Sequence, residues 1–225
     1  MSRSVLAIDG PSGAGKGTVC QLVAQELGWS LLDSGALYRI LGLAAIRAGI
    51  DLENGDSLGQ LVQMLRIGFD PNPCGEMQVL LAGENVTREI RTETAGDSAS
   101  QVAVHPQVRA ALLLLQQNYA EGCGLVADGR DMGTVVFPNA PLKIFLTASA
   151  EERANRRYKQ LKEQGEDVNV PRILEEVKAR DERDAARSAS PLIPADDAIQ
   201  IDSTAMSIEQ VTHAVLAEAK KRGLA

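Results

Sequence analysis

Residues 10–18 read Gly-Pro-Ser-Gly-Ala-Gly-Lys-Gly-Thr, and this stretch decides the fold. It follows a short apolar run at Val5–Ile8, and the residues after it carry apolar side chains at helical spacing from Val19 to Leu27. Glycines let the backbone turn so that successive N–H groups point at phosphate oxygens, and the helix N-terminus adds a favourable dipole. A strand, a glycine-rich loop and a helix in this order predict a phosphate-binding loop, with Lys16 on the β- and γ-phosphates of a nucleotide.

The loop departs from its usual sequence at one position. Ser or Thr usually follows the lysine directly, whereas this chain has Gly17 there and Thr18 one place later. The hydroxyl that usually coordinates Mg²⁺ is therefore missing from its place, and Thr18 is left to reach the ion through water.

Five short apolar runs are spread along the chain, separated by helical segments. They are Val5–Ile8, Trp29–Leu32, Leu125–Ala127, Leu142–Leu146 and Ala198–Ile201. Buried parallel strands look like this, so the sequence predicts an α/β fold with a five-stranded parallel sheet and helices on both faces. Gly28 is placed to end the first helix, and Ser149 with Glu152 and Ser207 with Gln210 fit helix starts. We expect a single domain over residues 1–225.

Two segments interrupt the alternation. From about 61 to 99 the apolar residues alternate around turn residues, which predicts a small antiparallel insert of about three strands before a long helix near residues 108–119. From about 148 to 170 an arginine-rich helix ends near Gly165, and we expect this segment to be a mobile lid.

Composition excludes several classes of protein. The 225 residues carry a net charge of −7 and only seven aromatic side chains (3 Phe, 3 Tyr, 1 Trp), which disfavours a nucleic-acid-binding surface. There is no apolar run of membrane-spanning length and no export signal, so we expect a cytoplasmic protein. Cys20, Cys74 and Cys123 are far apart and accompany only two histidines, which predicts buried thiols rather than a zinc site.

Polar clusters follow two more of the expected strands, at residues 33–39 (Asp-Ser-Gly-Ala-Leu-Tyr-Arg) and 128–134 (Asp-Gly-Arg-Asp-Met-Gly-Thr). Ligands of parallel sheets bind at the carboxyl ends of strands. Asp33 or Ser34 could instead cap the next helix, while Arg39 has no capping role and suits a phosphate or a base. Asp128 either forms a turn with its glycine or orients a Mg²⁺-bound water.

Together these motifs resemble those of bacterial-type cytidylate kinases, in the nucleoside monophosphate kinase group. The resemblance is carried by residues 10–18, 33–39, 129–134 and 180–187 and covers essentially the whole chain. Adenylate kinases share the first of these motifs but resemble neither the second nor the third. The resemblance implies transfer of the γ-phosphoryl group of ATP to CMP or dCMP, with Mg²⁺, giving ADP and CDP or dCDP.

The resemblance also implies roles for individual residues. Those expected at the cytosine are Ser34, Arg109, Asp131 and Arg187; at the sugar, Ser100, Arg180 and Asp184; at the acceptor phosphate, Arg39 and Arg130. On a helix, residues 180, 184 and 187 share one stripe, so they can address one ligand. The alternative is a solvated helix, because residues 151–187 hold as many acidic as basic side chains.

For the reaction itself we expect positively charged groups and no protein nucleophile. Lys16 and the loop amides would hold the donor phosphates, and Arg153 and Arg157, one helical turn apart, would close over the transferring group. Two alternatives remain: a phosphate-loop kinase for another small acceptor such as UMP, dTMP or a metabolite, and a nucleotide-binding switch that acts on a partner protein. We expect a monomer.

Overall fold

The computed structural model describes residues 4–71, 77–119, 124–163, 165, 167–187 and 190–225. The chain divides into two compact units, one made of residues 1–33 and 119–225 and the other of residues 34–118. The second unit is wider than the insert expected over 61–99.

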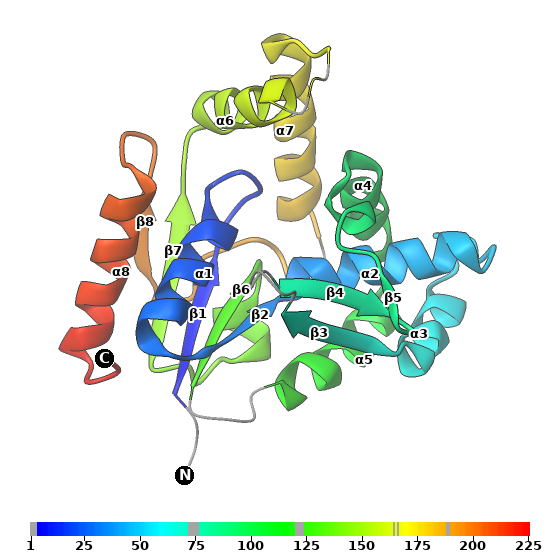
Figure 1. The fold of residues 1–225 in the computed structure, drawn as a ribbon, viewed down its shortest axis with the longest axis horizontal. Helices are drawn as coiled ribbons and strands as arrows, with labels where there is room; N and C mark the ends of the chain where they lie inside the picture. Colours follow the sequence, from blue (N-terminus) through cyan, green and yellow to red (C-terminus); the bar gives the residue numbers. More distant parts are fainter. Residues whose placement is uncertain (1–3, 72–76, 120–123, 164, 166, 188–189) are drawn as a thin grey trace. The chain divides into compact units, whose positions relative to one another are not determined.

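The first unit is built on a five-stranded sheet in which every described pairing is parallel, and this confirms the predicted fold class. The strands in spatial order are β2 (Ser30–Asp33), β6 (Leu125–Gly129), β1 (Val5–Asp9), β7 (Leu142–Thr147) and β8 (Ile199–Asp202). All five coincide closely with the apolar runs of the sequence (Figure 1). The three central strands are almost wholly buried, which explains why their sequences are continuous apolar runs.

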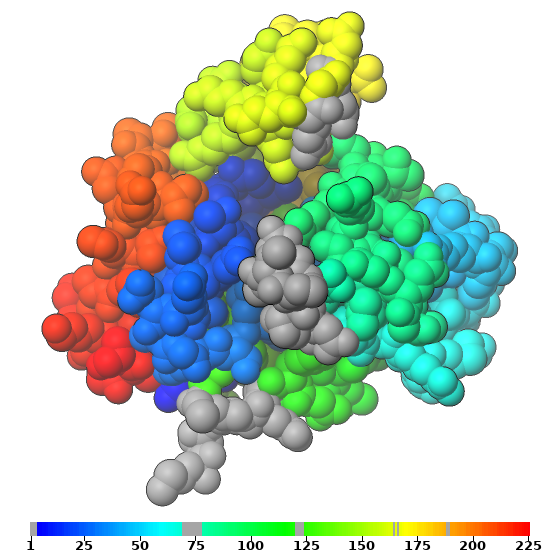
Figure 2. Space-filling model, in the orientation of Figure 1, coloured from blue at the N-terminus to red at the C-terminus, as the bar shows by residue number. Residues whose placement is uncertain are grey.

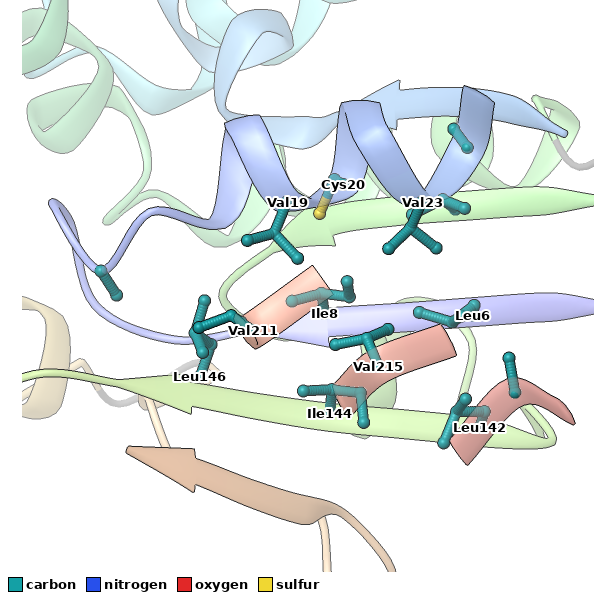
Figure 3. Packing of buried hydrophobic residues seen from close by; sticks show 14 residues of the cluster. Leu6, Ile8, Val19, Cys20, Val23, Leu142, Ile144, Leu146, Val211 and Val215 are labelled. Carbon is teal, nitrogen blue, oxygen red and sulfur yellow. The ribbon is translucent and has the colours of Figure 1, made fainter. Parts of the chain in front are cut away.

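Helices of the first unit accompany this sheet. They are α1 (Lys16–Leu27), α6 (Ala150–Glu163), α7 (Val170–Ala185) and α8 (Ile208–Lys221), with a short π-helical turn, η2 (Met132–Val136). Helices α1 and α8 are in contact, and Figure 2 shows them side by side in blue and red. Their apolar side chains pack on the central strands, with Val19 and Val215 beside Ile8 (Figure 3).

The helix ends follow the sequence signals. Gly28 adopts a left-handed conformation (φ 65°) and ends α1. Ser207 and Gln210 form a full capping box at the start of α8, and the Ser149 hydroxyl accepts the Glu152 N–H at the start of α6. The arginine-rich helix α6 ends at Glu163, two residues before Gly165.

The second unit contains the expected antiparallel sheet, with strands β3 (Ile67–Pro71), β4 (Met77–Leu81) and β5 (Glu84–Asn85). Its helical elements are α2 (Ser34–Arg47), α3 (Gly55–Met64), η1 (Glu89–Arg91), α4 (Glu93–Val102) and α5 (Pro106–Asn118). Ile40 of α2 packs with Val79 and Leu81 of β4, and with Val86 after β5, in the unit's own core.

Residues 61–99 are therefore not all strand and turn, as the alternation suggested. Residues 61–64 end α3, and residues 93–99 open α4. The sequence does not predict α4 as a helix because the segment is rich in small residues. These allow a close approach to α2, where a Cβ on Gly42 would lie 2.5 Å from the Ser98 hydroxyl oxygen.

Cys20 is a buried free thiol of α1, as expected, and burial raises its pKa well above the usual value. Cys74 and Cys123 lie outside the described residues. Among the residues that are described, no three His, Cys, Asp or Glu side chains are grouped to hold a metal ion. In the same part of the chain, no helix combines the length and apolar character needed to cross a membrane.

Candidate active site

The loop between β1 and α1 has the backbone that a phosphate cradle requires. Gly10, Gly13 and Gly15 all have positive φ angles, of 149°, 78° and 93°. Gly10 is required for a second reason, because a Cβ there would lie 2.0 Å from the carbonyl oxygen of Leu146 on β7. Because α1 begins at Lys16, its first N–H groups and its dipole add to the attraction for an anion.

Lys16 is buried in this loop, with 6% of its surface exposed. Its Nζ donates a hydrogen bond to the Pro11 carbonyl oxygen at 2.9 Å. Burial, and then the nearby positive charge of Arg130, lower its pKa to about 8, while Asp128 acts in the opposite direction. The ammonium therefore lies within the loop where phosphates are expected, and it carries a proton that burial makes easier to lose.

Asp128 lies near the end of β6, in register with Asp33 of β2. Burial raises its pKa to about 6, and Lys16 opposes that rise. A Cβ on Gly17 would lie 3.6 Å from Asp128 Oδ2, so this carboxylate faces the position where other phosphate loops carry Ser or Thr. One carboxylate beside a phosphate site is a donor set that suits Mg²⁺, which is usually held by one or two carboxylates together with substrate phosphates and water.

The segment after β6 is fixed by a residue that the sequence analysis did not select. Asp9, the last residue of β1, accepts hydrogen bonds from the backbone N–H groups of Met132 and Gly133, both at 2.7 Å. These bonds hold the start of η2. Arg130 and the buried Asp131 lie directly before it in the chain.

Asp184 on α7 connects this segment with the residues at 180, 184 and 187 that the sequence predicts on one face of a helix. It is 1% exposed and accepts a hydrogen bond from Arg130 Nε at 3.1 Å and another from Arg187. A buried carboxylate between two guanidinium groups is a positioned acceptor and not a solvated surface charge. The structure therefore brings Arg130, Asp184 and Arg187 together, and Arg180 lies one turn before Asp184 on the same helix.

The arginines of α6 do not behave alike. Arg153 is buried and donates to the carbonyl oxygens of Ser12 (3.1 Å) and Ala148 (3.0 Å) and to both oxygens of Asp181 on α7. Arg157 instead donates to Gln160 of its own helix at 2.8 Å. Figure 1 shows α6 above the loop that precedes α1, and the bond from Arg153 to Ser12 joins the two.

Arg156, which the sequence analysis did not select, also contacts the loop. Its guanidinium donates to the carbonyl oxygens of Ala14 (3.3 Å) and Ser203 (2.7 Å), and the Ser203 hydroxyl donates to Ala14 as well. Ser203 follows β8, so the end of β8, helix α6 and the phosphate loop meet here. Spacing alone cannot reveal Ser203, because its partners are remote in the chain.

Four expected site residues belong to the second unit. Ser34 begins α2 and is buried, and Arg39 donates to the Ile90 carbonyl oxygen at 3.2 Å. Ser100 is buried on α4, where it bonds the Gly96 carbonyl oxygen, and the Arg109 guanidinium lies 6.0 Å from the centre of the Tyr38 ring. Their contacts with an acceptor remain predictions.

Comparisons with known proteins agree with these motifs. A protein-family model described as cytidylate kinase matches residues 6–221. The chain is 59% identical over 222 residues to proteins named cytidylate kinase from Pseudomonas savastanoi pv. phaseolicola and from Stutzerimonas stutzeri, covering 98% of this chain and 97% of each relative.

A solved structure of an uncharacterized protein from Eubacterium ventriosum is similar in fold, with a TM-score of 0.53 at 13% identity over 97% of this chain and 99% of that one. The family match and the identity both span nearly the full length. With its phosphate loop and its Gly-Arg-Asp-Met-Gly-Thr segment, the chain belongs to the cytidylate kinase family.

Proposed function

We propose that this protein transfers the γ-phosphoryl group of ATP to CMP or dCMP, giving ADP and CDP or dCDP. The observation that carries the proposal is that one unit holds both a phosphate loop with Lys16 at its centre and a buried carboxylate, Asp184, bound by Arg130 and Arg187. The phosphate loop suits a nucleoside triphosphate. The two arginines and the carboxylate suit an acceptor that carries both negative charge and hydrogen-bond donors. Membership of the cytidylate kinase family supports the same reaction.

On the donor side, Lys16 and the backbone N–H groups of residues 10–18 bind the ATP phosphates. Lys16 has to exchange its hydrogen bond with the Pro11 carbonyl oxygen for phosphate oxygens. This exchange restores a full charge to a lysine whose pKa is lowered by burial, because the phosphates stabilise the ammonium form.

On the acceptor side, Arg130 and Arg39 hold the phosphate of CMP. Ser34, Arg109, Asp131 and Arg187 address the cytosine, and Ser100, Arg180 and Asp184 address the sugar. Asp184 is suited to accept a hydrogen bond from a sugar hydroxyl because its two arginine partners fix the direction of its carboxylate.

In the transfer step, an oxygen of the CMP phosphate forms a bond to the γ-phosphorus while the bond from that phosphorus to the bridging oxygen of ADP breaks. The transition state is loose and spreads negative charge over the γ-phosphoryl oxygens, so Lys16, Arg130, Arg153 and Arg157 act by stabilising that charge. Arg153 would leave Asp181 to do so, and the lid over residues 148–170 would keep water from the phosphoryl group.

Mg²⁺ would accompany ATP in this proposal, and Asp128 and Thr18 are the residues that would hold it through water. When bound it neutralises phosphate charge. We also expect the protein to be a monomer and to act in the cytoplasm. We expect no nucleic-acid partner.

The test is release of ADP from ATP and Mg²⁺ in the presence of a panel of acceptors: CMP, dCMP, UMP, dTMP and AMP. We expect turnover with CMP and dCMP, much less with UMP, and almost none without an acceptor. Faster turnover with UMP or dTMP would identify a different kinase, and acceptor-independent hydrolysis would favour a nucleotide switch.

A further inference from the structure

The carboxylate of Asp9 accepts hydrogen bonds from the acceptor segment, residues 129–134, and not from the phosphate loop that follows it. Asp9 is 4% exposed at the end of β1. Both carboxylate oxygens are used, Oδ1 by the Met132 N–H and Oδ2 by the Gly133 N–H, at 2.7 Å each. These partners lie 123 and 124 residues away in the chain.

Only a carboxylate can make this contact at this size. Two backbone donors converge at the start of η2, where the unpaired N–H groups of a helical turn favour negative charge. An asparagine offers one accepting oxygen, and its NH₂ group would face the second N–H, donor against donor. An alanine would leave both N–H groups buried without partners.

Gly133 has the shape that this contact requires. A Cβ there would lie 3.3 Å from Asp9 Oδ2 and 3.1 Å from the Cδ of Lys143. A Cβ at this position therefore requires the Asp9 carboxylate or the Lys143 side chain to shift by a small amount. Asp9 and Gly133 therefore fit each other, so a second substitution can disturb the same contact from the other side.

The main chain of Asp9 is held independently of its side chain. It is in register with Gly129 of β6 and Phe145 of β7 in the parallel sheet. Gly10 and the phosphate loop start from this fixed strand. The carboxylate instead holds residues 132–133, directly after Arg130 and Asp131.

We infer that Asp9 is a positioning residue for the acceptor: its carboxylate fixes the segment that carries Arg130 and Asp131 against the strand from which the phosphate loop starts. This inference rests on the acceptor roles given to Arg130 and Asp131 above. Displacements of about 1 Å in a positioning element can cost about a hundredfold in rate.

The charged groups around Asp9 are consistent with this role. The negative charge of Asp131 raises the pKa of Asp9, and the positive charge of Lys16 lowers it. Asp9 in turn raises the pKa of Asp128. Burial raises the pKa of Asp9 to about 6, although the two backbone N–H groups lower it. At neutral pH Asp9 is therefore ionised and can accept both bonds.

The test is Asp9→Asn in the full chain, with the Kd for ATP and the kcat and KM for CMP measured separately at pH 7.5. We expect kcat/KM for CMP to fall by at least about tenfold, through a higher KM and a lower kcat because Arg130 serves both acceptor binding and transfer, while the Kd for ATP changes less than about twofold. Gly133→Ala should give the same pattern, and the double variant should lose little more than either alone. Should Asp9→Asn fail to fold, Gly133→Ala makes the test by itself.

Val215→Ala is the matched control, because it removes buried core volume beside Ile8 of the same strand and leaves the Asp9 carboxylate and its two hydrogen bonds in place. It should lower thermal stability and leave KM for CMP unchanged. The positioning role would be overturned if Asp9→Asn weakened ATP and CMP binding equally. It would also be overturned if Val215→Ala raised the KM for CMP as much as Asp9→Asn does. A wild-type protein that does not phosphorylate CMP would instead refute the proposed function.

Discussion

Lys16 shows how one buried charge links loop structure to nucleotide binding. Its pKa of about 8 in the free protein means that it is half protonated near pH 8. Bound phosphates favour the charged form, so ATP should bind with uptake of about half a proton at pH 8, and ATP affinity should fall as the pH rises above 8. Calorimetric titrations in two buffers of different ionisation enthalpy measure this uptake; heats that do not depend on the buffer would contradict it.

Asp184 tests the sugar contact. Asp184→Ala removes the acceptor shared by Arg130 and Arg187 and leaves their donors with fewer partners. We expect kcat/KM for CMP and dCMP to fall roughly 5- to 150-fold, which corresponds to a loss of about 1 to 3 kcal/mol of transition-state stabilisation. Glu182→Ala, an exposed position on the same helix, is the control and should leave both values unchanged. Unchanged kinetics in Asp184→Ala would mean that this helix only forms ion pairs.

Asp131 tests base choice. Cytosine presents a donor at its exocyclic amine and an acceptor at N3, and uracil reverses both, so a carboxylate at this position favours cytosine. Asp131→Asn keeps the volume and supplies an amide that can donate. We expect it to narrow the preference for CMP over UMP by at least about tenfold, with ATP affinity nearly unchanged. Equal losses for both substrates would assign Asp131 to the phosphate or to the fold.

Some site residues could be read from the sequence and others could not. Lys16 and Asp128 were found because glycine spacing and strand ends place them locally. Asp9 and Ser203 were not, because their partners are remote in the chain: those of Asp9 lie 123 and 124 residues away, and those of Ser203 lie 47 to 189 residues away. A charged residue ending an otherwise apolar strand was a signal for Asp9, since a carboxylate in that place needs buried partners.

At the scale of elements, the five parallel strands were predicted because continuous apolar runs are a strong local signal. Helix α4 was missed because its buried face consists mostly of small residues such as Ala95 and Ala99, which mark a buried helix face less clearly than Leu or Ile do. Likewise, no local pattern predicts a π-helical turn such as η2, whose first two N–H groups donate to Asp9.

The start of the phosphate loop gives a prediction about two elements, β1 and β7. Gly10→Ala combines a positive φ with a Cβ 2.0 Å from the Leu146 carbonyl oxygen, so it should cost about 2 to 4 kcal/mol. We expect a melting temperature lower by roughly 5 to 15 °C and weaker ATP binding. Gly28→Ala is the control: it also has a positive φ, but a Cβ there meets nothing within 4 Å, so it should cost only about 1 kcal/mol. Equal shifts in both variants would rule out the clash.

At the scale of the whole molecule, the residues assigned to the substrates are divided between the two units. The donor loop and the Arg130–Asp184–Arg187 cluster belong to residues 1–33 and 119–225, while Ser34, Arg39, Ser100 and Arg109 belong to residues 34–118. The single domain expected from the sequence, with an insert at 61–99 and a lid at 148–170, remains a prediction about how these parts work together.

The most direct measurement of the central claim follows the phosphoryl group itself. With ATP labelled on its γ-phosphate, Mg²⁺ and CMP, the wild-type protein should place the label in CDP, and little should appear as free phosphate. Lys16→Met should keep the fold and lower kcat by at least about a hundredfold, because the transition state loses a positive charge. Label released as phosphate at the same rate with and without CMP, or unchanged label transfer by a folded Lys16→Met, would contradict this account.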